Sequence, residues 1–279
     1  MKEKVMKEER WTPRTGMGNK NNEICNLLGT ALESMTLKCK IVMKEHKIKD
    51  SILQALQAIK NFVLLGKGDF LQEFIELSES LLDRPTDKIS PNYVHNLIEE
   101  AAKASSCHQL YSNIKEELSF VFLRGDPVRT KGWRSFSLTF KSRPPISFIF
   151  HGEAMYDYEC VGNLLFCLRK CEHILVNFWR KSFLVGSAPL EHLRTAVHRL
   201  VVSIETYLFS IIEDFWSELL AVFESCNSVL ELLEANNHFL NRLKEVTTES
   251  QPLSNAMLSL LKLVEQFQSL WIKMEEGNI

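Results

Sequence analysis

Apolar residues recur every three or four positions along most of the chain, which is the spacing of one face of an amphipathic α-helix. This pattern predicts helices over residues 28–42, 48–65, 70–82, 91–107, 156–183, 193–222, 229–246 and 253–274. The segment 193–222 keeps the spacing over its whole length without a break. Long helices bury broad apolar faces by packing side by side, so the pattern indicates an antiparallel helical bundle.

Glycine, proline and polar residues mark where these helices begin and end. Gly66 and Gly68 follow the second predicted helix, as expected of a helix C-terminus. Asp69, with Gln72 three residues later, predicts a capping box at the start of the next helix. Ser90 before Pro91 predicts a further helix start, with serine as the cap and proline in the first turn.

The spacing changes to strict alternation in the middle of the chain. Three short runs, over residues 118–123, 135–140 and 146–150, alternate large apolar residues with smaller or polar ones. Alternation over runs of this length is typical of β-strands. We therefore predict an all-α fold, a long-helix bundle with a small antiparallel β insert at about residues 118–150.

Composition and charge narrow the class of protein. The chain of 279 residues is 45% hydrophobic and 24% charged, which excludes a collagen-like or largely disordered protein. Its 33 Lys+Arg and 35 Asp+Glu give a net charge of -2, so no basic excess points to nucleic acid. Residues 1–22 are charged and contain Pro13, Gly16 and Gly18, which predicts a flexible leader before a helical domain over 23–279.

The sequence contains no uninterrupted apolar run long enough to cross a membrane. The most apolar stretch, residues 197–223, is interrupted by His198, Arg199, Glu205, Glu213 and Asp214. The first ten residues are charged and lack the apolar centre of a signal peptide. We expect a cytoplasmic protein without membrane insertion.

The cysteines do not form a disulfide or zinc pattern. Cys160, Cys167 and Cys171 are seven and four residues apart, so they share one helical stripe with Leu164 and Ile174. Thiols on an apolar helix face are most often small buried hydrophobic groups. We predict reduced, buried thiols and no metal site.

Motifs that would indicate catalysis are missing from the sequence. Gly66-Lys67-Gly68 follows a predicted helix and precedes Asp69, whereas a phosphate-binding loop ends in Gly-Lys-Ser/Thr. The nucleophile motif Gly-x-Ser-x-Gly does not occur. No carboxylate pair stands out, and His192 and His198 are six residues apart, which does not place both on one helical face. We predict that the protein is not an enzyme and has no cofactor.

Three cations accompany the β insert: Arg134, Lys141 and Arg143. They lie beside the pair Pro144-Pro145 in an aromatic-rich segment. Under one interpretation they are solvated residues on a hairpin that covers the core. Under the other they form a cationic edge that faces an acidic partner. The residues alone leave both interpretations open.

Several landmarks together resemble one known family. Residues 61–75 (NFVLLGKGDFLQEFI) are similar to a segment that ends in Leu-Leu-x-x-Gly-Asp-Phe before a helix. Residues 133–146 (WRSFSLTFKSRPPI) look like a strand pair of the form Trp-x-x-Leu-x-Leu-x-Tyr-x-Val-x-Trp-Pro-Leu. Residues 235–240 (ANNHFL) are similar to an Ala-His-Asp-x-Phe-Leu helix. In order and spacing, about residues 45–275 resemble the C-terminal half of the gamma-tubulin complex (spindle pole body) components.

The motifs also depart from the family pattern. Phe140 stands where the family has tyrosine, Ser142 where it has valine, and Arg143 where it has tryptophan. Asn236 stands where a histidine is usual. We expect the sheet to tolerate these changes, although they alter the local surface offered to a partner.

The resemblance implies a partner and a role. Family members hold gamma-tubulin on this domain, and together with other gamma-tubulin complex components they template microtubules at a microtubule organizing centre or spindle pole. Tubulins are acidic, which favours partner binding by the three cations. No motif here matches the family's N-terminal domain, so we expect this chain to bind one gamma-tubulin without forming rings alone. The alternative is a helical-rod tether or coat subunit in membrane traffic.

Overall fold

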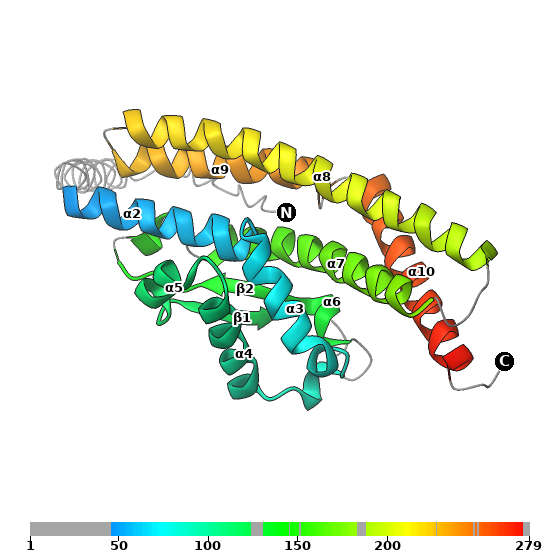
Figure 1. The fold of residues 1–279 in the computed structure, drawn as a ribbon. Helices are drawn as coiled ribbons and strands as arrows, with labels where there is room; N and C mark the ends of the chain where they lie inside the picture. The colour runs from blue at the N-terminus through cyan, green and yellow to red at the C-terminus, as the bar shows by residue number, and fades with distance from the viewer. Residues whose placement is uncertain are drawn as a thin grey trace, which may run out of the picture.

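The computed structural model describes residues 46–123, 131–144, 146–150, 152–182, 188–226, 228–247, 249 and 251–275. Figure 1 shows a bundle of long helices with a small sheet on one side, which confirms the predicted all-α class with a β insert. The helix predicted at 28–42 and the leader 1–22 lie outside the described residues.

The helices of the first half are short and those of the second half are long. In chain order the elements are α2 (His46–Ala58), the π-helix η1 (Ile59–Val63), α3 (Gly68–Leu82), the 3-10 helix η2 (Thr86–Lys88), α4 (Pro91–Ala104), α5 (His108–Ile114), β1 (Leu118–Phe122), α6 (Gly132–Ser135), β2 (Phe136–Phe140), the 3-10 helix η3 (Ile146–Phe148), α7 (Gly152–Ser182), α8 (Ala188–Ser225), α9 (Val229–Val246) and α10 (Gln251–Glu275). The sequence pattern did not predict α5 or α6.

The sheet has two antiparallel strands within the part of the chain that the structure describes. Leu118 pairs with Phe140, and Phe122 pairs with Phe136. The predicted strand at 146–150 is wrong, because residues 146–148 form a 3-10 turn. There the Phe150 amide donates to the Ile146 carbonyl. Ile149 and Phe150 are both buried, which alternation in a strand facing the core on one side does not allow.

The predicted capping box at Asp69 is also wrong. Helix α3 begins at Gly68 with Lys67 as its N-cap residue. The Asp69 carboxylate instead accepts a hydrogen bond of 2.7 Å from the Ser106 amide, which lies beyond the end of α4. Because this bond favours the charged carboxylate, it lowers the pKa of Asp69. The predicted helix start at Ser90 and Pro91 is confirmed, although the serine hydroxyl makes no capping bond.

A continuous aromatic core joins the first half of the chain to α7. Phe62 of η1 packs edge-on against Phe70 of α3, with ring centroids 5.1 Å apart. Phe136 of β2 lies 5.1 Å from Phe74 and 4.9 Å from Phe166 of α7. All five rings are almost completely buried. Their packing fixes η1, α3, β2 and α7 as one body.

Helix α7 approaches the π-helix unusually closely at Gly162. A Cβ atom at this position would lie 2.3 Å from the Val63 carbonyl oxygen and 3.2 Å from the Ser137 hydroxyl oxygen. Only glycine permits this approach without movement of the backbone.

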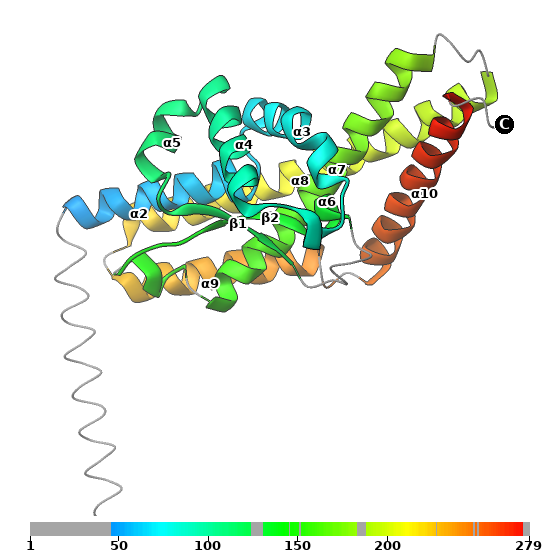
Figure 2. The ribbon, with the colours of Figure 1, turned by 90° about the horizontal axis from the view of Figure 1, so that it is seen from below.

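The long helices pack in a layer above this core. Helix α8 runs back along α7, and α9 packs against α8 (Figure 1). Helix α10 lies against α7, where the rings of Phe178 and Phe267 are 5.4 Å apart. Figure 2 shows that the far end of α7, the start of α8 and α10 project beyond the sheet and α2–α5. We call this projection, residues 170–182, 188–207 and 251–275, the arm.

Candidate protein interface

Arg134, the first of the three predicted interface cations, makes intramolecular contacts. Its Nη2 atom lies 2.6 Å from Oε2 of Glu265 on α10, and both side chains are about three quarters buried. The guanidinium also lies over the Trp133 ring, 5.7 Å from its centroid. The ion pair links α10 to α6, the short helix directly before β2, so Arg134 is engaged in the fold.

Lys141 and Arg143 lie together just after β2, away from Arg134. The Lys141 amide extends the strand pairing by donating to the Glu117 carbonyl at 2.7 Å, and its side chain is exposed. Nη2 of Arg143 lies 2.9 Å from Glu116 Oε2, and both of these side chains are 71% exposed. An ion pair this exposed contributes little to stability and exchanges readily for another partner. Partner contact by Lys141 and Arg143 stays a prediction.

A shallow groove lies beside Arg143. It encloses about 160 Å³ between α2, α5, the end of the sheet and η3. Its lining includes Gln54, Asn113, Glu117, Arg143 and Ile146. Phe148 of η3 projects into solvent with 64% of its surface exposed. A groove of this size is large enough to take single side chains of a protein partner.

The cysteine stripe on α7 is buried, as predicted for Cys167 and Cys171, whereas Cys160 is only half-buried. Burial raises the pKa of the Cys167 thiol and raises that of Cys171 to about 12. Both thiols are therefore protonated near neutral pH, which disfavours metal ligation and nucleophilic attack. Among the residues that the structure describes, no group of His, Cys, Asp and Glu is arranged to hold a metal ion.

A buried charge network between α7 and α8 was missed by the sequence analysis. Nη2 of Arg169 lies 2.9 Å from Glu205 Oε1, and its Nη1 lies 2.6 Å from Glu172 Oε2. Burial raises the pKa of Glu205 to about 7 in spite of the guanidinium. The signal was present, because Glu205 sits four residues after Val201 and three before Leu208 on the buried face of α8.

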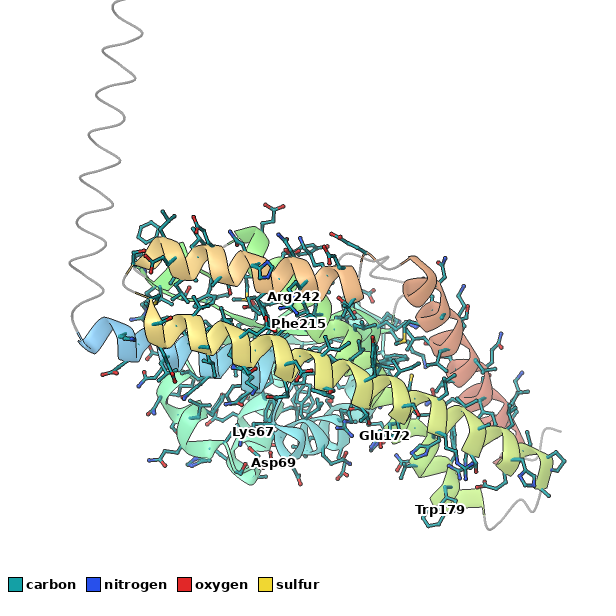
Figure 3. All side chains as sticks on the ribbon, turned by 90° about the horizontal axis from the view of Figure 1, so that it is seen from above. Lys67, Asp69, Glu172, Trp179, Phe215 and Arg242 are labelled. Carbon is teal, nitrogen blue, oxygen red and sulfur yellow. The ribbon has the colours of Figure 1, made fainter. Side chains whose placement is uncertain are left out.

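A second shallow groove lies between α8 and α9. It encloses about 110 Å³, and its lining combines apolar side chains with Glu218, His238 and Arg242. The Arg242 guanidinium lies 3.8 Å from the Phe215 ring centroid and pairs with Glu218. Figure 3 shows Phe215 and Arg242 close together here, while Trp179 lies far away on the arm. These contacts join α8 to α9, so we interpret the groove as part of the packing between these two helices.

Helix α8 is long and apolar enough to cross a membrane by length and composition, within the part of the chain that the structure describes. A single helix of this kind is weak evidence for a membrane span, and α8 packs against both α7 and α9, with 28% of its most apolar 18-residue window buried inside the fold. The absence of membrane insertion stays a prediction.

Comparison with known proteins identifies relatives along nearly the whole chain. Residues 52–277 match the family model described as "Gamma tubulin complex component C-terminal". The chain is 26% identical over 264 residues to Gamma-tubulin complex component 3 of Arabidopsis thaliana, covering 85% of this chain and 30% of that protein. It is 24% identical over 238 residues to the Homo sapiens Gamma-tubulin complex component 3, covering 79% and 26%. It is 24% identical over 289 residues to Spindle pole body component 98 of Dictyostelium discoideum, covering 97% and 34%. The chain therefore spans about a third or less of the length of these relatives.

Proposed function

Because this chain belongs to the gamma-tubulin complex component family, we propose that its helical domain binds gamma-tubulin and holds it in a microtubule-nucleating complex. The observation that carries the proposal is the match of residues 52–277 to the family's C-terminal model. The names of the relatives associate them with the gamma-tubulin complex and the spindle pole body. We extend that association to this chain, with other complex components as further partners and the microtubule organizing centre as its location in the cytoplasm.

The physical basis of this role is positioning. Free subunits that associate lose translational and rotational freedom, at a cost of about 4–15 kcal/mol. Subunits that are already held at the correct spacing meet their neighbours at a high effective concentration. The aromatic core that joins η1, α3, β2 and α7 supports this role, because closely packed interiors resist deformation. This mechanism needs no catalytic group, so we propose that the protein is not an enzyme.

Lys141 and Arg143 are the contacts that we propose at the sheet edge. Both are accessible, and Arg143 gives up only a solvent-exposed pair with Glu116 on binding an acidic surface. Arg134 is left out of this proposed contact because Glu265 engages it within the fold. The membrane-traffic alternative gains nothing from the family match or from the strand pair, since a helical rod has no need of a sheet.

The test measures gamma-tubulin affinity for the immobilised full chain by biolayer interferometry. We expect the double variant Lys141→Glu/Arg143→Glu to bind at least about tenfold more weakly, a loss of roughly 1.4 kcal/mol. The matched control is Lys103→Glu, because Lys103 is also exposed and paired, with Glu99 on α4. The control should keep its affinity, and both variants should keep the wild-type melting temperature.

The outcomes separate the function from the residues. A wild-type chain that does not bind gamma-tubulin at all would refute the proposed function. Equal binding by wild type and the double variant would leave the function standing and remove Lys141 and Arg143 from the interface.

A further inference from the structure

The buried face of α8 changes in character along the helix. Among its described side chains, those buried between Leu208 and Phe223 are all apolar. In the arm, between Ala188 and Glu205, four side chains are buried, and two of them, Arg194 and Glu205, are charged. The loss of hydration offsets most of the attraction within a buried ion pair, whereas apolar burial is favourable throughout. The arm half of α8 is therefore held against α7 less strongly than the half beyond it.

Arg194 contributes little to holding the two helices together. Its Nε atom lies 2.9 Å from Oε2 of Glu191, which is on the same helix. Its Nη1 atom donates to the Leu175 carbonyl of α7 at 3.3 Å. Of these contacts only the bond to Leu175 crosses from α8 to α7, and it is long for a hydrogen bond.

Glu205 shares its cation with a second carboxylate. Nη2 of Arg169 lies 2.9 Å from Glu205 Oε1, and Nη1 lies 2.6 Å from Glu172 Oε2. The Glu205 side chain is only 6% exposed, so little water screens the charges. When both carboxylates are ionised, the cluster carries a net negative charge. The repulsion between Glu205 and Glu172 then acts to separate α8 from α7.

The protonation of this cluster changes near neutral pH. Within the described residues, the charged groups that act on Glu205 are Arg169 and Glu172, both on α7, and none comes from α9. Burial outweighs the guanidinium and raises the pKa of Glu205 to about 7. His198 of α8 also faces the cluster, with Nε2 4.0 Å from Glu172 Oε1. A histidine gains charge as the pH falls, so this contact also becomes stronger at lower pH.

We propose that the arm half of the α7–α8 contact is a pH-sensitive joint, in which residues 188–205 separate from α7 as the pH rises through neutrality. Residues 208–223 stay packed, because their buried side chains are apolar. The joint lies where the arm leaves the rest of the domain: Figure 3 shows Glu172 near this place and Trp179 farther out on the arm. This property belongs to the domain itself and does not depend on gamma-tubulin binding.

Amide hydrogen exchange of the full chain, followed by mass spectrometry and corrected for the intrinsic exchange rates, tests the joint. A helix segment that leaves its packing partner unfolds locally, so residues 188–205 should exchange at least about tenfold faster than 208–223 at about pH 8. A carboxyl group with a pKa of about 7 when packed and 4.5 when free makes this opening roughly tenfold more frequent at about pH 8 than at about pH 6. Local opening exposes little surface, so low urea concentrations should leave it unchanged.

Glu205→Gln should remove the pH dependence of this opening, because glutamine is uncharged at both pH values. The matched control is Glu213→Gln, since Glu213 is an exposed carboxylate of the same helix that lies 2.6 Å from Lys60 Nζ. The control should keep the wild-type response to pH. Equal exchange of residues 188–205 and 208–223 at both pH values would show that α8 opens only by global unfolding, which would overturn the inference. A pH dependence that persists in Glu205→Gln would overturn it as well.

Discussion

Replacing Gly162 with alanine tests the packing of α7 directly, because two physical effects predict opposite results. Gly162 lies inside α7, where alanine is favoured over glycine by about 1 kcal/mol on helix propensity alone. Helix propensity therefore predicts that Gly162→Ala stabilises the protein. The packing predicts the reverse, because the added Cβ atom would lie 2.3 Å from the Val63 carbonyl oxygen.

The size of the effect follows from that distance. Ordinary contacts between non-bonded heavy atoms are roughly 3.5 Å, so α7 and the π-helix would have to separate by about 1 Å. The obstructing atom belongs to the backbone, so it cannot turn away as a flexible side chain could. Overpacking of a buried contact typically costs about 1–3 kcal/mol. Because the obstructing atom is a backbone oxygen at 2.3 Å, we expect the upper part of this range, about 2–3 kcal/mol, and after the gain in helix propensity a net loss of about 1–2 kcal/mol.

Thermal and urea unfolding of the full chain measure this loss. For a chain of this size the expected fall in melting temperature is roughly 2–8 °C. Gly68→Ala is the matched control, since a Cβ atom at Gly68 would have no heavy atom within 4 Å. That variant should be neutral or slightly stabilised. A Gly162→Ala protein that is as stable as wild type or more stable would show that α7 and η1 do not approach as the structure has them.

Three further perturbations address buried polar groups. Burial raises the pKa of Glu205 from 4.5 to about 7, so between these values the folded protein retains a proton that the unfolded chain releases. The free energy of unfolding should therefore fall as pH rises through this range. Urea titrations at several pH values should show that Glu205→Gln removes this pH dependence, and an unchanged pH dependence would contradict the prediction. In Asn236→Leu the Tyr158 hydroxyl, which lies 2.6 Å from Asn236 Oδ1 in the wild type, stays buried without its partner. The expected loss of stability is roughly 1–3 kcal/mol, and adding Tyr158→Phe should recover most of it. No recovery in the double variant would show that the loss arises from packing. Arg134→Gln should speed amide exchange in α10 while gamma-tubulin affinity stays unchanged, and an affinity loss with unchanged exchange would place Arg134 at the interface.

Helical periodicity predicted the long helices well because each buries one face over many turns. Helix α9 begins and ends at Val229 and Val246, as expected from its spacing, and α8 extends the predicted 193–222 by a few residues at each end. The same reasoning failed for residues 146–150, because five residues are too few to distinguish a strand from a turn that buries two consecutive side chains. In the structure Ile149 and Phe150 are the buried pair.

The sequence pattern could not predict polar contacts between residues that lie far apart in the chain. Asp69 has the local features of a helix cap, yet its partner is the amide of Ser106, thirty-seven residues later. Arg134 was grouped with Lys141 and Arg143 because they are neighbours in sequence. Its partner Glu265 lies 131 residues away, on a helix whose position only the fold determines. The local sequence identified the three cations. Only the tertiary structure shows that Arg134 is engaged within the fold while Lys141 and Arg143 lie at the sheet edge.

Sedimentation of the purified full chain with purified gamma-tubulin tests the central claim most directly. A binding domain that holds a single gamma-tubulin predicts one additional boundary at the mass of a one-to-one complex, with an amplitude that saturates at equimolar gamma-tubulin. Two independent boundaries at every ratio, at concentrations well above micromolar, would contradict the account.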